Sequence, residues 1–179
     1  MIKRLSPFLL GVKMEILICS DSHGNTDNLL RLAEDHPSAT HLFFCGDGLR
    51  DLSVLEEAFP RLVIASVCGN CDGFSLACDA PSERLVELFG LKILLMHGHT
   101  HGVKSGGTER LYRYALARGA DILIFGHSHL PFEQSDVIDG KRIYLFNPGS
   151  IGKRELFGYS YGVLTIQENG FLLSHGRYR

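Results

Sequence analysis

Residues 14–25 read MEILICSDSHGN, an apolar run that leads directly into a carboxylate and an imidazole. Such a run predicts a buried β-strand, and Asp21 and His23 then follow where the strand ends. Four more motifs follow apolar runs further along the chain: Gly46-Asp47, Gly69-Asn70-Cys71-Asp72, His97-Gly98-His99 and Gly126-His127-Ser128-His129. Together the five motifs supply enough oxygen and imidazole ligands for two divalent metal ions, and a two-metal centre is typical of enzymes that hydrolyse phosphate esters.

Short apolar runs alternate with amphipathic stretches through the first two thirds of the chain, which predicts βα units. The expected strands are 14–19, 41–45, 62–67, 84–89, 91–96 and 122–125, and the expected helices are 25–35, 51–59 and 108–118. After Pro131 the pattern predicts only strands, at 132–138, 142–146, 161–166 and 171–174. We therefore expect an α/β protein with two packed sheets and helices outside them. All five motifs follow strands, and in open α/β sheets ligands bind beyond the carboxyl ends of the strands.

The sequence predicts a single domain from residue 14 to residue 179, because it contains no internal repeat, low-complexity segment or linker. Residues 1–13 precede the first strand and include the apolar group PFLLGV. A signal peptide needs a longer apolar region and a small-residue cleavage site, and neither is present. The first strand begins at its own methionine, Met14, so we interpret residues 1–13 as an N-terminal extension that is dispensable or comes from an upstream start.

The composition is that of a globular protein with a substantial core, since 45% of the 179 residues are hydrophobic and 21% are charged. A net charge of −2 and an isoelectric point of about 6.5 give no nucleic-acid signal, because nucleic-acid-binding domains are usually basic. No apolar stretch is long enough to span a bilayer. Five cysteines, three of which end apolar runs, indicate the reducing cytoplasm and not a secreted disulfide scaffold.

The first two motifs also have a plain structural interpretation. Asp21 and His23 are two residues apart, so in an extended segment both side chains point to one side and can reach one ion. A cluster of Asp, Ser and Asn is equally common as a cap before a helix. Asp47 lies between two glycines. This position is unhindered for a carboxylate that contacts two ions, but Gly-Asp-Gly is also a common turn sequence. The residues alone leave both interpretations open for Asp21 and His23, whereas for Asp47 taken in isolation they favour the turn.

The third motif offers an amide oxygen from Asn70 and a carboxylate from Asp72, which are hard ligands, but residues 68–71 also match C-x-x-C. A redox dithiol of this kind should open a helix, and no helical pattern follows Asp72-Gly73 closely. A zinc site would need more soft ligands, and the chain has no second C-x-x-C. We therefore favour the oxygen-ligand interpretation over the dithiol.

Two segments, GHTH directly after His97 and GHSH around His127, fit the pattern G-H-x-H. In one assignment, His97 is a single ligand, and His127 and His129 are a pair of ligands. These histidines then follow the ends of the two expected strands that precede them, 91–96 and 122–125. The other assignment, His99 with His101, leaves the second pair without a role, so we prefer the first. His99 and His101 are then candidates for contacting substrate or a metal ligand. An ordinary solvated side chain is the plain interpretation for four histidines: His36, His41, His101 and His175.

The ordered pattern D-x-H, G-D, G-N-x-D, H-G-H and G-H-x-H resembles the calcineurin-like metallophosphoesterase superfamily. The pieces SDSHGN, GNCD and NPGS, at residues 20–25, 69–72 and 147–150, are similar to its small YfcE-type phosphodiesterase branch. The resemblance extends from Met14 to about Leu173, and five motifs in order are far more specific than any one of them. It implies a four-layer α/β/β/α sandwich of two mixed sheets flanked by helices, the metallophosphatase fold.

The resemblance also implies a binuclear metal centre. Its ligand roles fall on Asp21, His23 and His129 for the first ion, on Asn70, His97 and His127 for the second, and on Asp47 as the bridge between both. A set of nitrogen and oxygen ligands without thiolate suits manganese, which we expect, and also nickel, cobalt, iron or zinc. The expected reaction is hydrolysis of a phosphodiester by a bridging hydroxide, because two ions lower the pKa of a shared water.

Three further residues are expected at the catalytic centre beside Asp47 and Asn70. His99 is a candidate phosphate contact, and Asp72 is expected to orient a ligand or Cys71. Many superfamily members have histidine where this chain has Cys71, although the small branch commonly has cysteine. A thiol with an ordinary pKa of about 8.5 is a poor substitute for an imidazolium donor, so we expect a preference for activated or diester substrates.

Two rival functions share this fold. A phosphomonoesterase would use the same site, and the residues alone do not separate it from a diesterase. A non-catalytic scaffold would have lost ligands, whereas all seven expected positions are filled here. No motif identifies a base or a sugar, so the expected partner is a small phosphoester substrate, with no membrane. The branch tends to self-associate, which implies a homo-oligomer, either a dimer or a tetramer.

Overall fold

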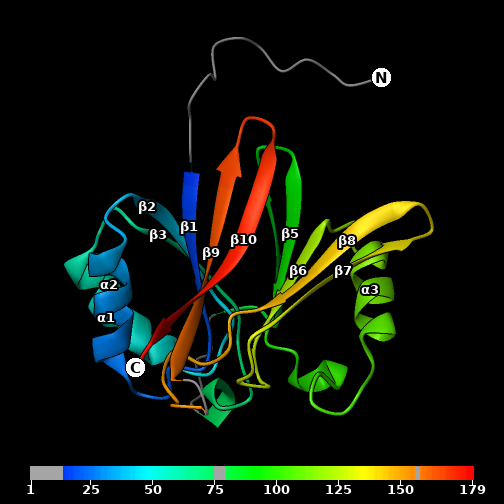
Figure 1. The fold of residues 1–179 in the computed structure, drawn as a ribbon. Helices are drawn as coiled ribbons and strands as arrows, with labels where there is room; N and C mark the ends of the chain where they lie inside the picture. Colours follow the sequence, from blue (N-terminus) through cyan, green and yellow to red (C-terminus); the bar gives the residue numbers. More distant parts are fainter. Residues whose placement is uncertain (1–13, 75–79, 156–157) are drawn as a thin grey trace.

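The computed structural model describes residues 14–74, 80–155 and 158–179 (Figure 1). Within these residues the strands form two five-stranded sheets. The first has the order β10-β9-β1-β2-β3 and contains β1 (Met14–Cys19), β2 (Ala39–Phe44), β3 (Val63–Ser66), β9 (Tyr159–Gln167) and β10 (Gly170–Tyr178). The second has the order β4-β5-β6-β8-β7 and contains β4 (Glu83–Leu88), β5 (Leu91–Met96), β6 (Ile122–Phe125), β7 (Phe132–Ile138) and β8 (Lys141–Asn147).

Both sheets are mixed. Strands β1, β2 and β3 run parallel in the first sheet, as β5, β6 and β8 do in the second. The hairpin partners pair antiparallel, β9 with β10, β4 with β5 and β7 with β8. The loops that follow the parallel strands of both sheets therefore gather at one end of the molecule, the lower end in Figure 1.

Helices cover the outer faces of the two sheets. α1 (Thr26–Asp35) and α2 (Ser53–Ala58) pack on the first sheet, and α3 (Thr108–Ala117) packs on the second (Figure 1). One apolar cluster lies between the sheets, and a further cluster lies under the helices on each side. The predicted four-layer α/β/β/α sandwich is thus confirmed. Among the described residues, three short 3₁₀ helices lie in the loops at the end of the parallel strands: η2 (Leu49–Leu52), η3 (Asp72–Phe74) and η4 (His99–His101).

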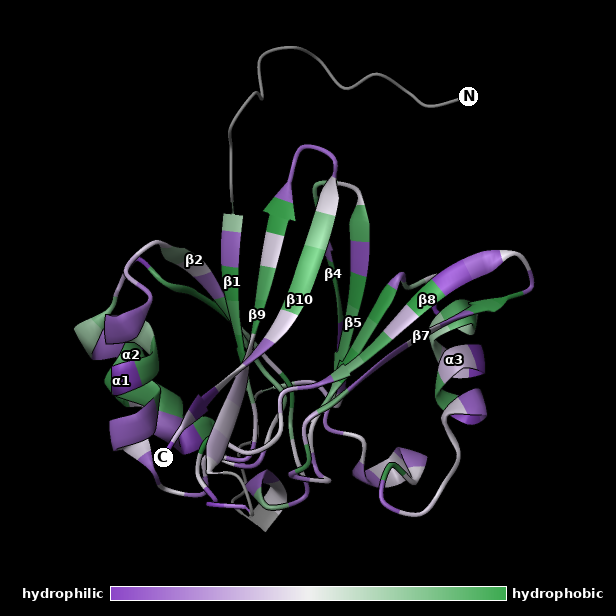
Figure 2. Ribbon diagram, viewed as in Figure 1, coloured by the Kyte–Doolittle hydropathy of each residue, from purple (hydrophilic) through white to green (hydrophobic). Residues whose placement is uncertain are grey.

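Strand β1 shows why the layers form. Its residues Ile16, Leu17, Ile18 and Cys19 are all buried. Because successive side chains of a strand point to opposite faces, Ile16 and Ile18 pack between the sheets while Leu17 and Cys19 pack toward the helices. A strand that is apolar on both faces needs a layer on each side. Figure 2 shows hydrophobic residues along most of β1 and both hydrophobic and hydrophilic residues on the helices.

Most element boundaries lie close to those expected, and the hairpin turn after β4 adopts positive φ at Phe89 (50°) and Gly90 (82°). Strand β10 is the main exception, because it continues to Tyr178 where the sequence predicts an end at Ser174. The residues beyond Ser174 lack an apolar alternation. Tertiary contacts replace it: the His175 ring stacks on Phe146 with centroids 4.4 Å apart, and Tyr178 is buried.

No helix in the described part of the chain is long and apolar enough to cross a membrane. Cys19, Cys45 and Cys71 are free, whereas Cys68 is disulfide-bonded. A disulfide at Cys68 is not what a reducing compartment predicts, and the cytoplasmic location stays a prediction. Residues 1–13, interpreted above as an extension, lie outside the described residues, and the single domain from 14 to 179 stays a prediction.

Candidate metal centre

The expected ligands all lie in the loops at the end of the parallel strands. In chain order they follow β1 (Asp21 and His23), β2 (Asp47), β3 (Asn70), β5 (His97) and β6 (His127 and His129). Three of these strands belong to the first sheet and two to the second. The candidate centre is therefore assembled across the contact between the sheets (Figure 1).

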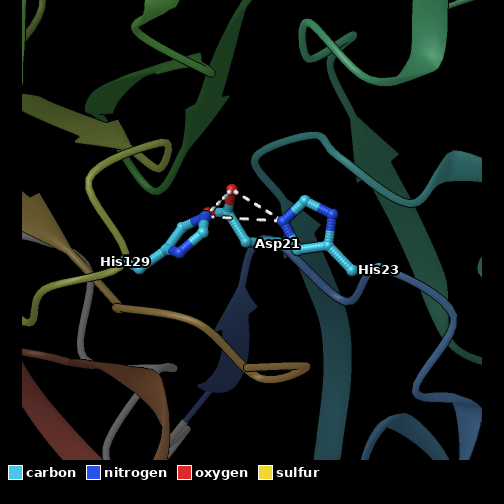
Figure 3. Close-up of side chains that lie close together, drawn as sticks. All are labelled: Asp21, His23 and His129. Atoms are coloured by element: carbon cyan, nitrogen blue, oxygen red, sulfur yellow. Dashed lines mark hydrogen bonds and ion pairs between the residues drawn. The ribbon is translucent and has the colours of Figure 1, made fainter. Parts of the chain in front are cut away.

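Asp21, His23 and His129 form the first group of ligand atoms (Figure 3). Oδ1 of Asp21 lies 3.2 Å from Nε2 of His129 and 3.8 Å from Nε2 of His23. The two Nε2 atoms are 3.4 Å apart. One carboxylate oxygen and two imidazole nitrogens thus point toward a common position, in the arrangement that a divalent cation requires.

The two oxygens of Asp21 have different surroundings. Oδ2 accepts hydrogen bonds from Ser20 Oγ (2.5 Å) and from the backbone N–H of His127 (3.1 Å). Oδ1 is buried and has no hydrogen-bond partner among the described residues. An unpartnered buried carboxylate oxygen is costly unless an ion or a proton compensates it. The residues present therefore fit a cation at Oδ1.

Asp47, His97 and His127 form a second group, whose ligand atoms lie within 4.8 Å of one another. His97 Nε2 lies 3.4 Å from Asp47 Oδ2 and 3.1 Å from Asn70 Oδ1, so the amide oxygen joins this group. His97 Nδ1 donates to the carbonyl oxygen of Cys45 (2.7 Å), which directs Nε2 toward the other ligands.

The two groups adjoin at Asp47. His23, Asp47 and Cys71 also offer ligand atoms within 4.8 Å of one another, and His23 belongs to the first group while Asp47 belongs to the second. The structure thus brings together all seven side chains that the sequence predicts as ligands. The position of Asp47 next to both groups is what a bridging carboxylate needs.

The ligand loops have an unusual backbone. Seven non-glycine residues in the described part of the chain have positive φ, and two of them, Phe89 and Asp139, lie in hairpin turns. The other five are expected ligands: Asp21 (57°), His23 (45°), Asp47 (60°), His127 (65°) and His129 (62°). Such conformations cost about 1–3 kcal/mol each and persist where surrounding contacts hold them, typically at functional sites.

Asp72 holds two of these loops together. Its Oδ2 accepts the backbone N–H of Asp47 (2.8 Å) and of Gly69 (2.8 Å), and its Oδ1 accepts those of Gly48 (2.8 Å) and Leu49 (2.9 Å). The carboxylate is therefore committed to four N–H groups. Asp72 thereby holds the backbone of Asp47, and its role in orienting a ligand stays a prediction.

Cys71 lies at the exposed edge of the centre. Its backbone N–H donates to Asp47 Oδ1 (2.7 Å), and its Sγ accepts a hydrogen bond from Asn70 Nδ2 (3.2 Å). Burial and the hydrogen bond with Asp47 raise the pKa of the thiol, so Cys71 is neutral at pH 7. Cys68 and Cys71 do not form a dithiol pair, since Cys71 is free.

The electrostatics suit metal ligands at Asp47 and His127. At His97, burial tends to lower the pKa, but the hydrogen bond with Asp47 and the charges of Asp21 and Asp47 raise it. Burial tends to raise the pKa of Asp47, but hydrogen bonds from His97 and from the Cys71 N–H outweigh it and hold this pKa well below its usual range. Burial and the neighbouring His97 lower the pKa of His127 to about 4. At neutral pH Asp47 is thus ionised and His127 is neutral, which are the forms that bind cations.

His99 lies beside the second group without belonging to it. Its exposed ring lies 5.4 Å from that of His97 and 6.2 Å from that of His127, measured between centroids. Burial and the charge of His97 lower its pKa, so it too is neutral at pH 7. A neutral, exposed imidazole at this position is available to a substrate.

Several histidines outside the centre have specific partners where solvated side chains were expected. His101 packs on Tyr114 with ring centroids 4.4 Å apart, and His36 Nδ1 lies 3.0 Å from Glu15 Oε1. His175 Nε2 donates to the carbonyl oxygen of Asn147 (2.8 Å). That expectation is therefore wrong for these three, because their partners are distant in the sequence. His41 is half-buried at the start of β2, next to Thr40.

Residues that lie outside the five motifs also support the ligands. Glu155 Oε1 lies 3.5 Å from Nδ1 of His129. Asp51 Oδ2 accepts hydrogen bonds from Ser22 Oγ (2.6 Å) and from the backbone N–H of Gly24 (2.8 Å). Their only sequence signal is a carboxylate in a loop, which is too common to be informative. Two residues of the segment NPGS also hold the ligand loops. Ser150 Oγ donates a hydrogen bond to the carbonyl oxygen of Asp21 (2.8 Å), and Asn147 Nδ2 donates one to the carbonyl oxygen of Gly126 (2.8 Å).

Comparison with known families agrees with this geometry. Residues 14–169 match the model of the calcineurin-like phosphoesterase superfamily domain. The chain belongs to this superfamily. The expectation drawn from the five motifs is thereby confirmed, and the chain is a homologue of metallophosphoesterases, which use divalent metals.

Individual members of the superfamily resemble the chain over most of its length. The probable metallophosphoesterase YsnB of Bacillus subtilis is 40% identical over 159 residues, which cover 87% of this chain and 86% of YsnB. The phosphodiesterase YfcE of Escherichia coli is 26% identical over 160 residues, covering 77% of this chain and 79% of YfcE. The solved structure of an archaeal phosphodiesterase has the same fold, with a TM-score of 0.70 at 21% identity over 91% of this chain and all of that one (100%).

Proposed function

We propose that this protein is a phosphodiesterase that hydrolyses phosphate ester bonds with two divalent metal ions. One observation carries the proposal: two groups of ligand atoms, Asp21–His23–His129 and Asp47–His97–His127, adjoin at Asp47. A single structural ion would need only one group. Two adjacent ions form the centre that in-line displacement at phosphorus uses.

The residues divide between the two ions as the motif order implies. Asp21, His23 and His129 would hold the first ion, Asn70, His97 and His127 the second, and Asp47 would contact both. When bound, the ions supply Lewis acidity toward phosphoryl oxygens and a water of lowered pKa. Contacts that hold the ligands are already in place, because Cys45 orients His97, Glu155 lies beside His129 and Asp72 holds the backbone of Asp47.

Manganese is the proposed metal. The ligand set contains only carboxylate and amide oxygens and imidazole nitrogens, which manganese accepts together, as do nickel, cobalt, iron and zinc. Cys71 Sγ belongs to the group with His23 and Asp47, but its raised pKa keeps it as a thiol and makes it a weak ligand.

The preference for diesters over monoesters follows from the same thiol. A poor leaving group needs a proton donor, and a neutral thiol of raised pKa is a weak acid at pH 7. His99 and His127 are neutral as well, so neither side chain brings an imidazolium to the exposed edge of the centre. We therefore propose activated esters and diesters as substrates, with His99 contacting the phosphate.

The test is hydrolysis of bis(p-nitrophenyl) phosphate by protein stripped with a chelator and then reloaded with manganese. Activity should appear only with metal and should exceed that toward p-nitrophenyl phosphate. Nickel, cobalt, iron and zinc are compared in parallel, and bound metal is counted by elemental analysis. The expected stoichiometry is about two ions per chain.

The Asp47→Asn variant separates the alternatives. Loss of activity with loss of one or both ions supports the shared carboxylate, and full activity would contradict the two-metal mechanism. Greater turnover of the monoester would identify a phosphomonoesterase with the same centre. If the wild-type protein hydrolyses neither ester with any of the five metals, this result would favour a non-catalytic scaffold. Assembly into a dimer or tetramer stays a prediction from the resemblance.

A further inference from the structure

The turn after β8 runs directly along the loop that carries Asp21. Ser150 Oγ donates to the carbonyl oxygen of Asp21 (2.8 Å), and the N–H of Gly152 donates to the same oxygen (3.1 Å). A Cβ atom on Gly152 would come within 1.8 Å of the carbonyl oxygen of Ser22, so the two backbones are in contact there. The turn is thus tied to the first ligand group at its backbone.

This attachment fixes the position of Lys153. Its backbone N–H donates to Ser150 Oγ (2.8 Å), the same hydroxyl that binds the carbonyl of Asp21. The Lys153 side chain is exposed, and no carboxylate in the described part of the chain forms an ion pair with it. By contrast, Lys141 pairs with Asp121 at 2.8 Å. Lys153 therefore carries an uncommitted positive charge on a turn that is hydrogen-bonded to the Asp21 loop.

The charge of Lys153 acts on both sides of the exposed edge. Burial, and next the charge of Lys153, lower the pKa of His23 in the first ligand group. Burial raises the pKa of Cys71, which follows β3, and the charge of Lys153 opposes that rise. His23 and Cys71 offer ligand atoms within 4.8 Å of one another, and the Lys153 backbone is hydrogen-bonded through Ser150 to the Asp21 loop. Lys153 therefore lies at the edge of the centre that His23 and Cys71 form.

We propose that Lys153 binds the phosphoryl oxygens of the substrate at the exposed edge between His23 and Cys71. This assignment rests on the proposed phosphodiesterase function. A lysine ammonium has three donors and is a common phosphate ligand. An anchored backbone reduces the cost of placing the flexible side chain beside the metal ligands.

Arg154 is the matched control. It has the same charge, is the next residue and is also exposed, but it shows no contact with the ligand loops in the described structure. The variants are Lys153→Met, Lys153→Arg and Arg154→Met. Binding of inorganic phosphate to the manganese-loaded protein is measured by calorimetry, and kcat/KM is measured with bis(p-nitrophenyl) phosphate.

Lys153→Met should weaken phosphate binding and lower kcat/KM by roughly tenfold, the value expected for one hydrogen bond from a charged donor. Lys153→Arg should recover most of both, because the charge is kept. Arg154→Met should stay within about twofold of wild type. Metal content should be the same in all variants, since Lys153 binds substrate and not metal.

Equal effects of Lys153→Met and Arg154→Met would overturn the assignment, because they would indicate a general surface charge. Unchanged phosphate affinity in Lys153→Met, or loss of its metal, would overturn it as well. The outcome for the proposed function is separate. If the wild-type protein binds phosphate through Lys153 but hydrolyses no ester, the assignment of Lys153 stands and the proposed function is wrong. If the protein is an active phosphodiesterase but Lys153→Met changes neither phosphate binding nor kcat/KM, the proposed function stands and the assignment of Lys153 is wrong.

Discussion

Oδ1 of Asp21 lies 3.2 Å from Nε2 of His129, although Asp21 follows β1 in the first sheet and His129 follows β6 in the second. The pair therefore exists only when the two sheets are packed. The same buried Oδ1 has no hydrogen-bond partner among the described residues. A cation at this position would link the sheets and should bind the folded state alone.

Manganese should accordingly stabilise the protein through His129. At 100 times its Kd, a ligand of the folded state contributes about 2.7 kcal/mol, which corresponds to a Tm increase of about 5–10 °C for a protein of this size. His129→Ala should lose most of this shift. His101→Ala, from the other G-H-x-H segment, should keep it, because His101 packs on Tyr114 outside the ligand groups. Thermal unfolding with and without metal measures both, and equal shifts would refute the assignment.

Asp72→Ala should destabilise the metal-free protein. The substitution leaves four backbone N–H groups without their acceptor, on loops that carry Asp47 and Gly69. We expect a loss of about 2–4 kcal/mol in the free energy of unfolding. Asp136→Ala, an exposed carboxylate on β7, should change it by under about 1 kcal/mol. Urea denaturation monitored by circular dichroism compares the two variants. Similar losses in the free energy of unfolding would argue against the role of Asp72 in holding these loops together.

Gly126→Ala tests how closely the two sheets approach. A Cβ atom there would lie 1.9 Å from Ser20 Oγ and 2.9 Å from Asp21 Oδ2, so the Asp21 loop must shift. We expect a loss of about 1–3 kcal/mol and weaker metal binding. Gly107→Ala is the control, since a Cβ atom there would meet no other atom within 4 Å and its cost at a helix start is about 1 kcal/mol or less. Calorimetric metal titration should separate the two, and unimpaired binding in Gly126→Ala would contradict the prediction.

The lowered pKa of His127 predicts a pH dependence for the metal-free protein. Its folded pKa of about 4 lies below its ordinary value of 6.5, so the unfolded chain binds the proton first as the pH falls. Stability should therefore decrease between about pH 6.5 and pH 4, by about 1–2 kcal/mol after allowance for the partial exposure of the ring. His127→Asn should show a smaller decrease over the same window. Urea unfolding at several pH values tests this, and parallel curves for both proteins would contradict it.

Cys71→His should extend the substrate range. A histidine at this exposed position supplies a proton donor of ordinary pKa near 6.5 in place of a thiol whose pKa is raised. We expect an increase of about tenfold or more in kcat/KM toward diesters with poor leaving groups, and little change for p-nitrophenyl diesters. Cys71→Ser removes the thiol without adding a base and should resemble wild type. No gain in Cys71→His would show that the thiol does not limit the reaction.

Local sequence was sufficient for most of the strands and helices, with the end of β10 as the main exception, and for the order of the ligands along the chain. The apolar run 14–19 predicts β1, because a strand that is buried on both faces can be recognised from its own residues without knowledge of its neighbouring strands. Asp21 and His23 follow this strand closely. The identity of the seven ligand residues rested on the motifs and on a family resemblance, and the structure brings all seven together.

The convergence of these atoms required the tertiary structure. GHTH and GHSH are nearly identical as sequences, yet His129 reaches Asp21 while His101 packs on Tyr114. The positive φ of the ligand loops and the four donors to Asp72 are equally invisible in the chain, since each depends on contacts between distant segments. Local sequence therefore specifies which side chains are available and in what order, because strands and turns are local. Packing of the two sheets decided which of them meet, because distances between loops depend on non-local contacts.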